Sequence, residues 1–266
     1  MFGDLIHGEG AYIHNLVGLK YSKTGYADMW RLEQNASKNG NLYPTHGLGP
    51  ICQCMDINRG DRMEYLTSMA SNDFTMNAEA KKRAAKDDFY KKYAGMPFRG
   101  NMNTTLVRTA KGRTIMIQHD VSSPRPYSRI HLLSGTKAFA EKYPKQMIAL
   151  GHRAVSDEKM KELKEKFSPE IVTKIGAMAR KVGGHGGMDF LMDWSLINSL
   201  RNGLPVDMDC YDAALWSCIT PLSIKSIANR SNSVDVPDFT RGNWKTNKPV
   251  KLELEAVNGV RETKKV

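Results

Sequence analysis

The amino-acid sequence predicts an α+β domain: a mostly antiparallel sheet with helices gathered beside it. Two observations carry this prediction. Residues 104–109 and 113–121 are β-rich runs joined across Ala110, Lys111 and Gly112, which is typical of a hairpin with glycine at the turn position that favours positive φ. Helical patterns, by contrast, are concentrated after residue 156. Strands and helices that cluster in this way indicate a sheet-centred α+β arrangement.

Size and composition leave room for one large domain or two small ones. The chain has 266 residues, and 41% of them are hydrophobic, which is ample for a packed core. No run of 18 apolar residues occurs, so we expect no membrane span. The first ten residues lack the basic and apolar regions of a signal peptide.

The formal net charge of +11 raises the question of a nucleic-acid partner. The basic residues are scattered, however, and the densest run, residues 81–92, also contains Asp87 and Asp88. Such a run is typical of a solvated helix face, so we expect no nucleic-acid binding.

Four cysteines are present, at positions 52, 54, 210 and 218. Cys52 and Cys54 are too close for an ordinary disulfide, and no Cys-x-x-Cys pair exists for zinc. The sequence therefore predicts buried free thiols and no metal site.

The elements of the first half follow in order. We expect strands over residues 3–14, 62–71, 128–133 and 146–150, the last two separated by a turn at Gly135. Residues 18–40 are rich in Gly, Ser and Asn and predict a loop. A short helix is expected over residues 47–55, just past His46, and a longer one over residues 76–93.

The second half is predicted to be mainly helical. Residues 156–182 form a charged helical stretch broken at Ser168 and Pro169, and residues 188–202 form a helix that Gly203 ends. Met188, Leu191 and Trp194 are expected to face a core. A helix over residues 210–219 should be followed by a separate one beginning at Thr220 and Pro221. Residues 235–244 are expected to be irregular.

The most informative stretch is residues 40–50 (GNLYPTHGLGP), which has neither helical nor strand periodicity. Proline and glycine restrict the backbone, so such a loop can hold polar groups in one geometry. Tyr43 and His46 can both form hydrogen bonds and transfer protons. On residue types alone, a functional site and a rigid connection with a satisfied histidine both remain open.

Several catalytic signatures are absent from the sequence. No Gly-x-Gly-x-x-Gly follows a strand; the nearest strings are Gly47-Leu48-Gly49 and the cluster at residues 183–187. There is no Walker loop, no His-Glu-x-x-His and no Gly-x-Ser-x-Gly. Nor can a glycosidase-type carboxylate pair be recognised, because the sequence does not report the spacing that such a pair needs.

Seven strings, spread over nearly the whole chain, carry a family resemblance. They lie at residues 7–14 (HGEGAYIH), 40–50 (GNLYPTHGLGP), 57–62 (INRGDR), 112–116 (GRTIM), 123–129 (SPRPYSR), 184–190 (GHGGMDF) and 238–242 (DFTRG). They closely resemble glycoside hydrolase family 109, the NAD-dependent α-N-acetylgalactosaminidases of the Gfo/Idh/MocA superfamily. One departure is Asn15-Leu16-Val17, where the family has Asp-Leu-Arg.

The resemblance implies that the chain corresponds to one half of such an enzyme. Family members have an N-terminal Rossmann domain that holds NAD and a C-terminal domain with an open, mostly antiparallel sheet and helices on one face. The chain resembles the C-terminal domain over residues 1–255, followed by a charged tail at 256–266, and the Rossmann domain is missing. A fragment, a split gene and a remnant all remain open.

The resemblance also implies a reaction route and a set of site residues. The sugar is oxidised at C3 with NAD, loses its C2 proton, eliminates the aglycone and adds water. His46 and Tyr43 are expected to share the acid/base work, and Tyr43 to lie against the nicotinamide. The expected contacts to an N-acetylgalactosamine-containing glycan are Tyr12, Arg31, Tyr43, Pro44, Thr45, His46 and Tyr127.

Each of these residues has a purely structural alternative. Tyr12 and Tyr127 could be core tyrosines, and Arg31 could stack on Trp30. His185 is a weak candidate that could cap the following helix. His14 and His119 are expected to be structural.

Two further functions remain open at this stage. One is a sugar dehydrogenase of the same superfamily, and the other is a non-catalytic carbohydrate-binding or oligomerisation module. A homodimer through the sheet face is a possible partner arrangement in either case. The compartment is open between export to the periplasm and the cytoplasm of a bacterium.

Overall fold

The computed structural model describes residues 1–250. Contacts divide the chain into two compact units. The first comprises Met1–Ala154 and Ala214–Asn247, and the second is centred on Val155–Ala213. The predicted charged tail at 256–266 lies outside the described residues.

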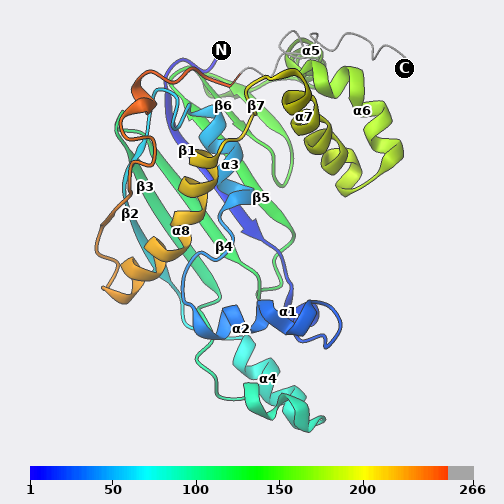
Figure 1. Ribbon diagram of the computed structural model, residues 1–266, viewed down its shortest axis with the longest axis vertical. Helices are drawn as coiled ribbons and strands as arrows, with labels where there is room; N and C mark the ends of the chain where they lie inside the picture. The colour runs from blue at the N-terminus through cyan, green and yellow to red at the C-terminus, as the bar shows by residue number, and fades with distance from the viewer. Residues whose placement is uncertain (251–266) are drawn as a thin grey trace. The chain divides into compact units, whose positions relative to one another are not determined.

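The first unit is built on a nine-stranded sheet (Figure 1). Its strand order is β8-β7-β6-β5-β1-β4-β3-β2-β9, and every neighbouring pair is antiparallel except β1 and β4. The strands are β1 Leu5–Ile13, β2 Met63–Ala70, β3 Met102–Thr109, β4 Thr114–Asp120, β5 Ser128–Gly135, β6 Ala138–Glu141, β7 Met147–Leu150, β8 Arg153–Ala154 and β9 Val234–Asp235. The mostly antiparallel sheet expected from the sequence is confirmed.

The predicted hairpin is β3 and β4, paired from Met102 opposite Asp120 to Arg108 opposite Thr114. Because β1 and β4 run parallel, their carboxyl ends meet at the same edge of the sheet. Tyr12 on β1 thereby lies beside its register partner, His119 on β4.

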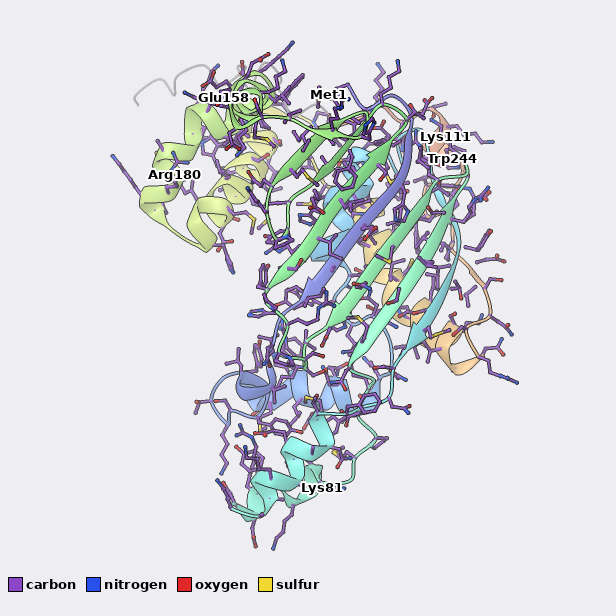
Figure 2. All side chains as sticks on the ribbon, turned by 180° about the vertical axis from the view of Figure 1, so that it is seen from behind. Met1, Lys81, Lys111, Glu158, Arg180 and Trp244 are labelled. Carbon is purple, nitrogen blue, oxygen red and sulfur yellow. The ribbon has the colours of Figure 1, made fainter. Side chains whose placement is uncertain are left out.

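Helices cover one face of this sheet. Figure 1 shows α3 (Thr45–Cys54) and α8 (Cys210–Ala228) in front of the strands, and Figure 2 shows the opposite face without a covering helix. The main core fills the space between these helices and the strands, with Leu48, Ile51, Leu66, Val107, Ile117 and Trp216 among its buried side chains. The open face carries exposed apolar side chains such as Tyr65, Met69 and Leu106.

A second core lies among the shorter helices of this unit. These are α1 Val17–Lys20, η1 Ala27–Met29, α2 Trp30–Ser37, α4 Met76–Ala84 and η2 Asp88–Tyr93. Their buried side chains include Tyr21, Leu32, Met76, Tyr90 and Phe98. The expectation of a loop over residues 18–40 is therefore wrong. An eight-residue helix such as α2 is marginal alone, and burial of Leu32 and Ala36 in this core is what stabilises it.

Other sequence predictions differ in detail. The helix expected over residues 76–93 is two elements, α4 and the 3-10 helix η2. Helix α3 begins at Thr45, so Thr45 and His46 belong to its first turn. Strands β6, β8 and β9 were not predicted. The helices predicted on either side of Pro221 are one helix, α8, because Thr220 does not act as a cap: its hydroxyl donates to the carbonyl oxygen of Asn41 at 2.9 Å.

The second unit contains α5 Asp157–Phe167, α6 Glu170–Val182, η3 His185–Gly187 and α7 Met188–Asn202. The predicted break at Pro169 and the stop at Gly203, with φ 64°, are confirmed. Met188 is 47% exposed, however, and the buried residues of α7 are Asn198 and Ser199. Apolar side chains lie all around this helix, so the sequence pattern could not select its buried face.

The four cysteines form no disulfide. Cys52 is buried, as predicted, on the face of α3 that it shares with Leu48, Ile51 and Met55. Cys54 and Cys210 are exposed, so the prediction of buried thiols is wrong for them. Within residues 1–250, no helix has the length and apolar character needed to cross a membrane.

Candidate functional site

Five ring-bearing side chains meet at the edge where the parallel strands β1 and β4 end. We call them the aromatic cluster: Tyr12, His14, Tyr43, His46 and Tyr127. The ring centroid of Tyr12 lies 4.6 Å from that of Tyr43, 5.2 Å from that of His46 and 6.4 Å from that of Tyr127. Tyr43 and His46 are 4.7 Å apart, and His14 and Tyr127 are 5.1 Å apart. The structure thus brings together residues from three separate segments.

Two glycines allow this meeting. A Cβ atom on Gly10 would lie 2.3 Å from the carbonyl oxygen of Gly47, and one on Gly47 would lie 2.3 Å from the backbone nitrogen of Ala11. The first turn of α3 therefore rests directly on the backbone of β1, with no room for a side chain. Pro44 precedes this turn, and its carbonyl oxygen accepts from the Gly47 and Leu48 amides at 3.1 and 2.9 Å. The result is that Tyr43 and His46 lie against Tyr12.

The backbone of His46 is also held from β5. The Nε2 atom of His131 is 2.9 Å from the His46 carbonyl oxygen and must donate to it, which places the ring proton on Nε2. Burial lowers the pKa of His131, so its ring is uncharged at neutral pH. His131 and its neighbour Ile130 both have positive φ, at a bulge in the pairing of β1 with β5.

Tyr12 and His14 form a hydrogen-bonded pair. The Tyr12 hydroxyl lies 3.2 Å from Nδ1 of His14. Burial raises the pKa of Tyr12, while the nearby Arg31 guanidinium opposes the shift. Burial and then Arg31 lower the pKa of His14. At neutral pH the tyrosine is protonated and the histidine uncharged, so Tyr12 can donate to His14.

Arg31 reaches the cluster from α2. Its guanidinium carbon lies 5.1 Å from the ring centroid of Tyr43, 4.7 Å from that of Tyr26 and 5.1 Å from that of Trp30. Nη1 of Arg31 donates to the Tyr26 hydroxyl at 3.1 Å. The aromatic stacking considered from the sequence is confirmed, and the same geometry places the cation beside the cluster.

The other expected contact residues lie around the cluster's margin. Thr45 is exposed, and Pro44 is buried and serves as the residue before the first turn of α3. Tyr127 is 39% exposed, and Arg129 Nε donates to its hydroxyl. His185, the weak candidate, belongs to the second unit, where its Nδ1 lies 2.9 Å from a carboxylate oxygen of Asp189.

A cavity of about 340 Å³ opens beside Tyr12 and Tyr43. Trp30 and Lys38 are exposed parts of its lining, and three buried side chains, Lys20, Asn35 and His119, form what we call the floor. Sequence reasoning missed Lys20 and Asn35, which lie in the stretch predicted to be a loop. His119 was expected to be structural, and the Leu42 amide donates to its Nδ1 at 3.2 Å.

The open sheet with helices on one face is also found in solved structures of a sugar dehydrogenase. Two solved structures of levoglucosan dehydrogenase illustrate it, one with NADH and one with NADH and L-sorbose. They superpose with TM-scores of 0.58 and 0.59, over 90% of this chain and 60% and 61% of theirs, at 14% identity. At that identity the likeness establishes the fold alone.

The chain belongs to glycoside hydrolase family 109: the family profile described as "Glycosyl hydrolase 109, C-terminal domain" matches residues 1–246. "Glycosyl hydrolase family 109 protein 2" of Shewanella sp. (strain ANA-3) is 48% identical over 94% of this chain and 55% of its own length. "Alpha-N-acetylgalactosaminidase" of Bacteroides fragilis is 46% identical over 92% of this chain and 59% of its own length. The chain thus spans little more than half the length of these relatives.

Proposed function

We propose that the chain is the substrate-binding half of an NAD-dependent α-N-acetylgalactosaminidase. The observation that carries the proposal is the aromatic cluster, in which Tyr43 and His46 lie 4.7 Å apart and both contact Tyr12. Two groups able to transfer protons therefore border one half-buried surface at the end of parallel strands, where open sheets bind ligands. The name of the Bacteroides fragilis relative supports the choice of sugar.

The proposed roles follow from chemistry at C2 and C3 of the sugar. Bound NAD+ would supply a hydride acceptor for C3 and return the hydride at the end. His46 and Tyr43 would move the C2 proton and protonate the leaving oxygen. Arg31 would orient the sugar oxygens or the acetamido carbonyl, and Tyr12 and Tyr127 would donate hydrogen bonds and form the wall of the site.

Among the described residues, a surface suited to the nicotinamide ring of this cofactor is present, but a site for its phosphates is not. Tyr43 offers a half-buried ring next to the Arg31 guanidinium, a surface on which a flat heterocycle can lie. No glycine-rich turn between a strand and a helix, of the kind that binds a pyrophosphate, is found in residues 1–250. A second domain would have to hold the phosphates, so we propose that this chain does not turn over alone.

A binding and turnover experiment tests this proposal. Purified chain is incubated with NAD+ and an aryl α-N-acetylgalactosaminide, and N-acetylgalactosamine binding is measured by saturation-transfer NMR. We expect sugar binding without release of the aryl group. Release would overturn the half-enzyme proposal, and absence of sugar binding would overturn the assignment of the site. Oxidised sugar without aglycone release would favour the dehydrogenase alternative.

A self-association role has its own support in the open sheet face, where Tyr65, Met69 and Leu106 are exposed. We propose a homodimer through this face, since exposed apolar surface of this kind often marks an interface. Sedimentation of wild-type chain and of Met69→Asp tests it. A monomer in both would contradict the dimer.

A further inference from the structure

The lining of the cavity carries an unbalanced charge. It includes three basic side chains, Lys20, Arg31 and Lys38, and no carboxylate. The two acidic residues with the strongest influence on Lys20 are engaged elsewhere. Asp120 accepts from the amides of Ser122 and Ser123. Asp73 accepts from three amides at the start of α4.

Lys20 is the least expected of these basic residues, because its side chain is 1% exposed. Its Nζ donates to Asn35 Oδ1 at 2.8 Å and to the Val121 carbonyl oxygen at 3.4 Å. An uncharged amine has two N–H groups and one lone pair. These two acceptors use both N–H groups, and the lone pair is then available to accept a proton. Among the described residues, Lys20 has no carboxylate ion-pair partner.

The surroundings of Lys20 favour the uncharged form. Burial, followed by the Arg99 and Arg31 guanidinium groups, lowers the pKa of Lys20 to about 6, against the weaker opposing effect of Asp120 and Asp73. Burial also holds the pKa of His119 well below its usual range, so this neighbour adds no charge. At neutral pH the floor therefore contains an amine that an added negative charge would protonate.

We propose that the cavity binds an anionic group of a sugar ligand, a carboxylate, sulfate or phosphate ester, and that Lys20 takes up one proton when it does. The proton comes from solvent, no covalent bond forms, and the product is an ammonium–anion pair beside Arg31. Lys38, an exposed part of the lining, adds a third cation, and the rings of Tyr12, Tyr43 and Trp30 provide apolar surface for the sugar. The inference rests on the proposed function in placing a sugar at Tyr12 and Tyr43.

Calorimetry of the full chain tests the proposal. N-acetylgalactosamine 6-sulfate and N-acetylgalactosamine are titrated at pH 5.5, 6.5, 7.5 and 8.5 in buffers of different ionisation enthalpy. We expect the sulfated sugar to bind at least about tenfold more tightly at pH 6.5. We expect uptake of about one proton at pH 7.5, with affinity falling by up to about tenfold per pH unit above pH 6.

Three variants distinguish proton uptake by Lys20 from a general attraction between the anion and positive charge. Lys20→Met should abolish the proton uptake and the pH dependence. Lys38→Met should weaken binding and leave the uptake intact. The matched control is Lys23→Met, since Lys23 is an exposed neighbour that pairs with Asp87 at 2.7 Å outside the cavity, and it should behave as wild type. If Lys20→Met does not fold, the uptake in wild type and the Lys38→Met result still decide the question.

Each contrary result has a distinct meaning. Equal affinity for both sugars, or unchanged proton uptake in Lys20→Met, would overturn the inference while leaving the proposed function intact. Failure of the sulfated sugar alone to bind would also overturn the inference, whereas failure of both sugars would count against the proposed function. Inorganic sulfate binding as tightly as the sulfated sugar, or NAD+ alone causing the uptake, would remove the sugar from the inference and overturn it.

Discussion

The aromatic cluster and the floor of the cavity share Tyr12 as a neighbour but differ in physical character. The cluster consists mainly of half-buried rings that contact one another. The floor consists of buried polar groups, and Lys20 among them is held uncharged by burial and by neighbouring cations. The difference matches the two roles proposed above, which are proton transfer on a ligand for the cluster and a response to a ligand's charge for the floor.

The largest expected effect is a loss of turnover rate when a residue of the aromatic cluster is replaced. In an enzyme completed with its dinucleotide-binding domain, His46→Ala should lower kcat/KM by about a hundredfold or more, because a group that transfers protons is lost. Steady-state kinetics on an aryl α-N-acetylgalactosaminide measure this. The control His152→Ala changes an exposed histidine near the β7–β8 turn and should leave the rate unchanged. Near-normal turnover of the His46 variant would remove His46 from the mechanism.

The next largest effect is expected from a substitution that disturbs the close contact between β1 and α3, on which the cluster depends. Gly10→Ala places a Cβ atom 2.3 Å from the Gly47 carbonyl oxygen, so α3 must move away from β1. We expect a loss of about 1–3 kcal/mol in the free energy of unfolding, measured in urea, together with weaker sugar binding.

Gly18→Ala is the matched control for this change. No heavy atom lies within 4 Å of a Cβ placed there, and the position is helical, in α1. It should be neutral or slightly stabilising. Equal stability of the Gly10 and Gly18 variants would show that β1 and α3 can separate at little cost.

A third prediction concerns the floor alone. The pKa of Lys20 is about 6 in the folded chain and about 10.5 when the residue is exposed, so between these values the unfolded state binds more protons. Stability should therefore rise with pH over this interval by up to about 1.4 kcal/mol per pH unit. The Lys20→Met variant should lack this contribution in urea titrations at pH 6, 7, 8 and 9. Parallel pH profiles for the two proteins would mean that Lys20 is charged in the folded state.

The smallest effect tests the support beneath His46. His131→Phe removes the hydrogen bond from Nε2 to the His46 carbonyl oxygen, which should cost about 1 kcal/mol in the free energy of unfolding. His152→Phe, at an exposed histidine, is the control for adding a phenyl ring. If the two variants lose stability equally, the bond to His46 contributes nothing measurable.

Much of the fold followed from local patterns. The β3–β4 hairpin was predicted because alternating residues and Gly112, with φ 79°, act over a few positions. Helix α2 was missed because its eight residues have no side-chain cap and depend on a core formed with α4 and η2. The break predicted at Pro221 failed for a similar reason, since Thr220 bonds to Asn41, a residue far away in the chain.

The sequence by itself determined the family and named four of the five residues of the aromatic cluster, all except His14, because these are carried by contiguous strings that need no spatial information. It also determined the mostly antiparallel sheet, since strand alternation and turn residues act locally. Only the tertiary structure decided that Gly10 and Gly47 allow β1 and α3 to lie in direct backbone contact. It also decided that Lys20 lies buried near Arg99. Close approach and burial depend on segments distant along the chain, and so no local pattern contains them.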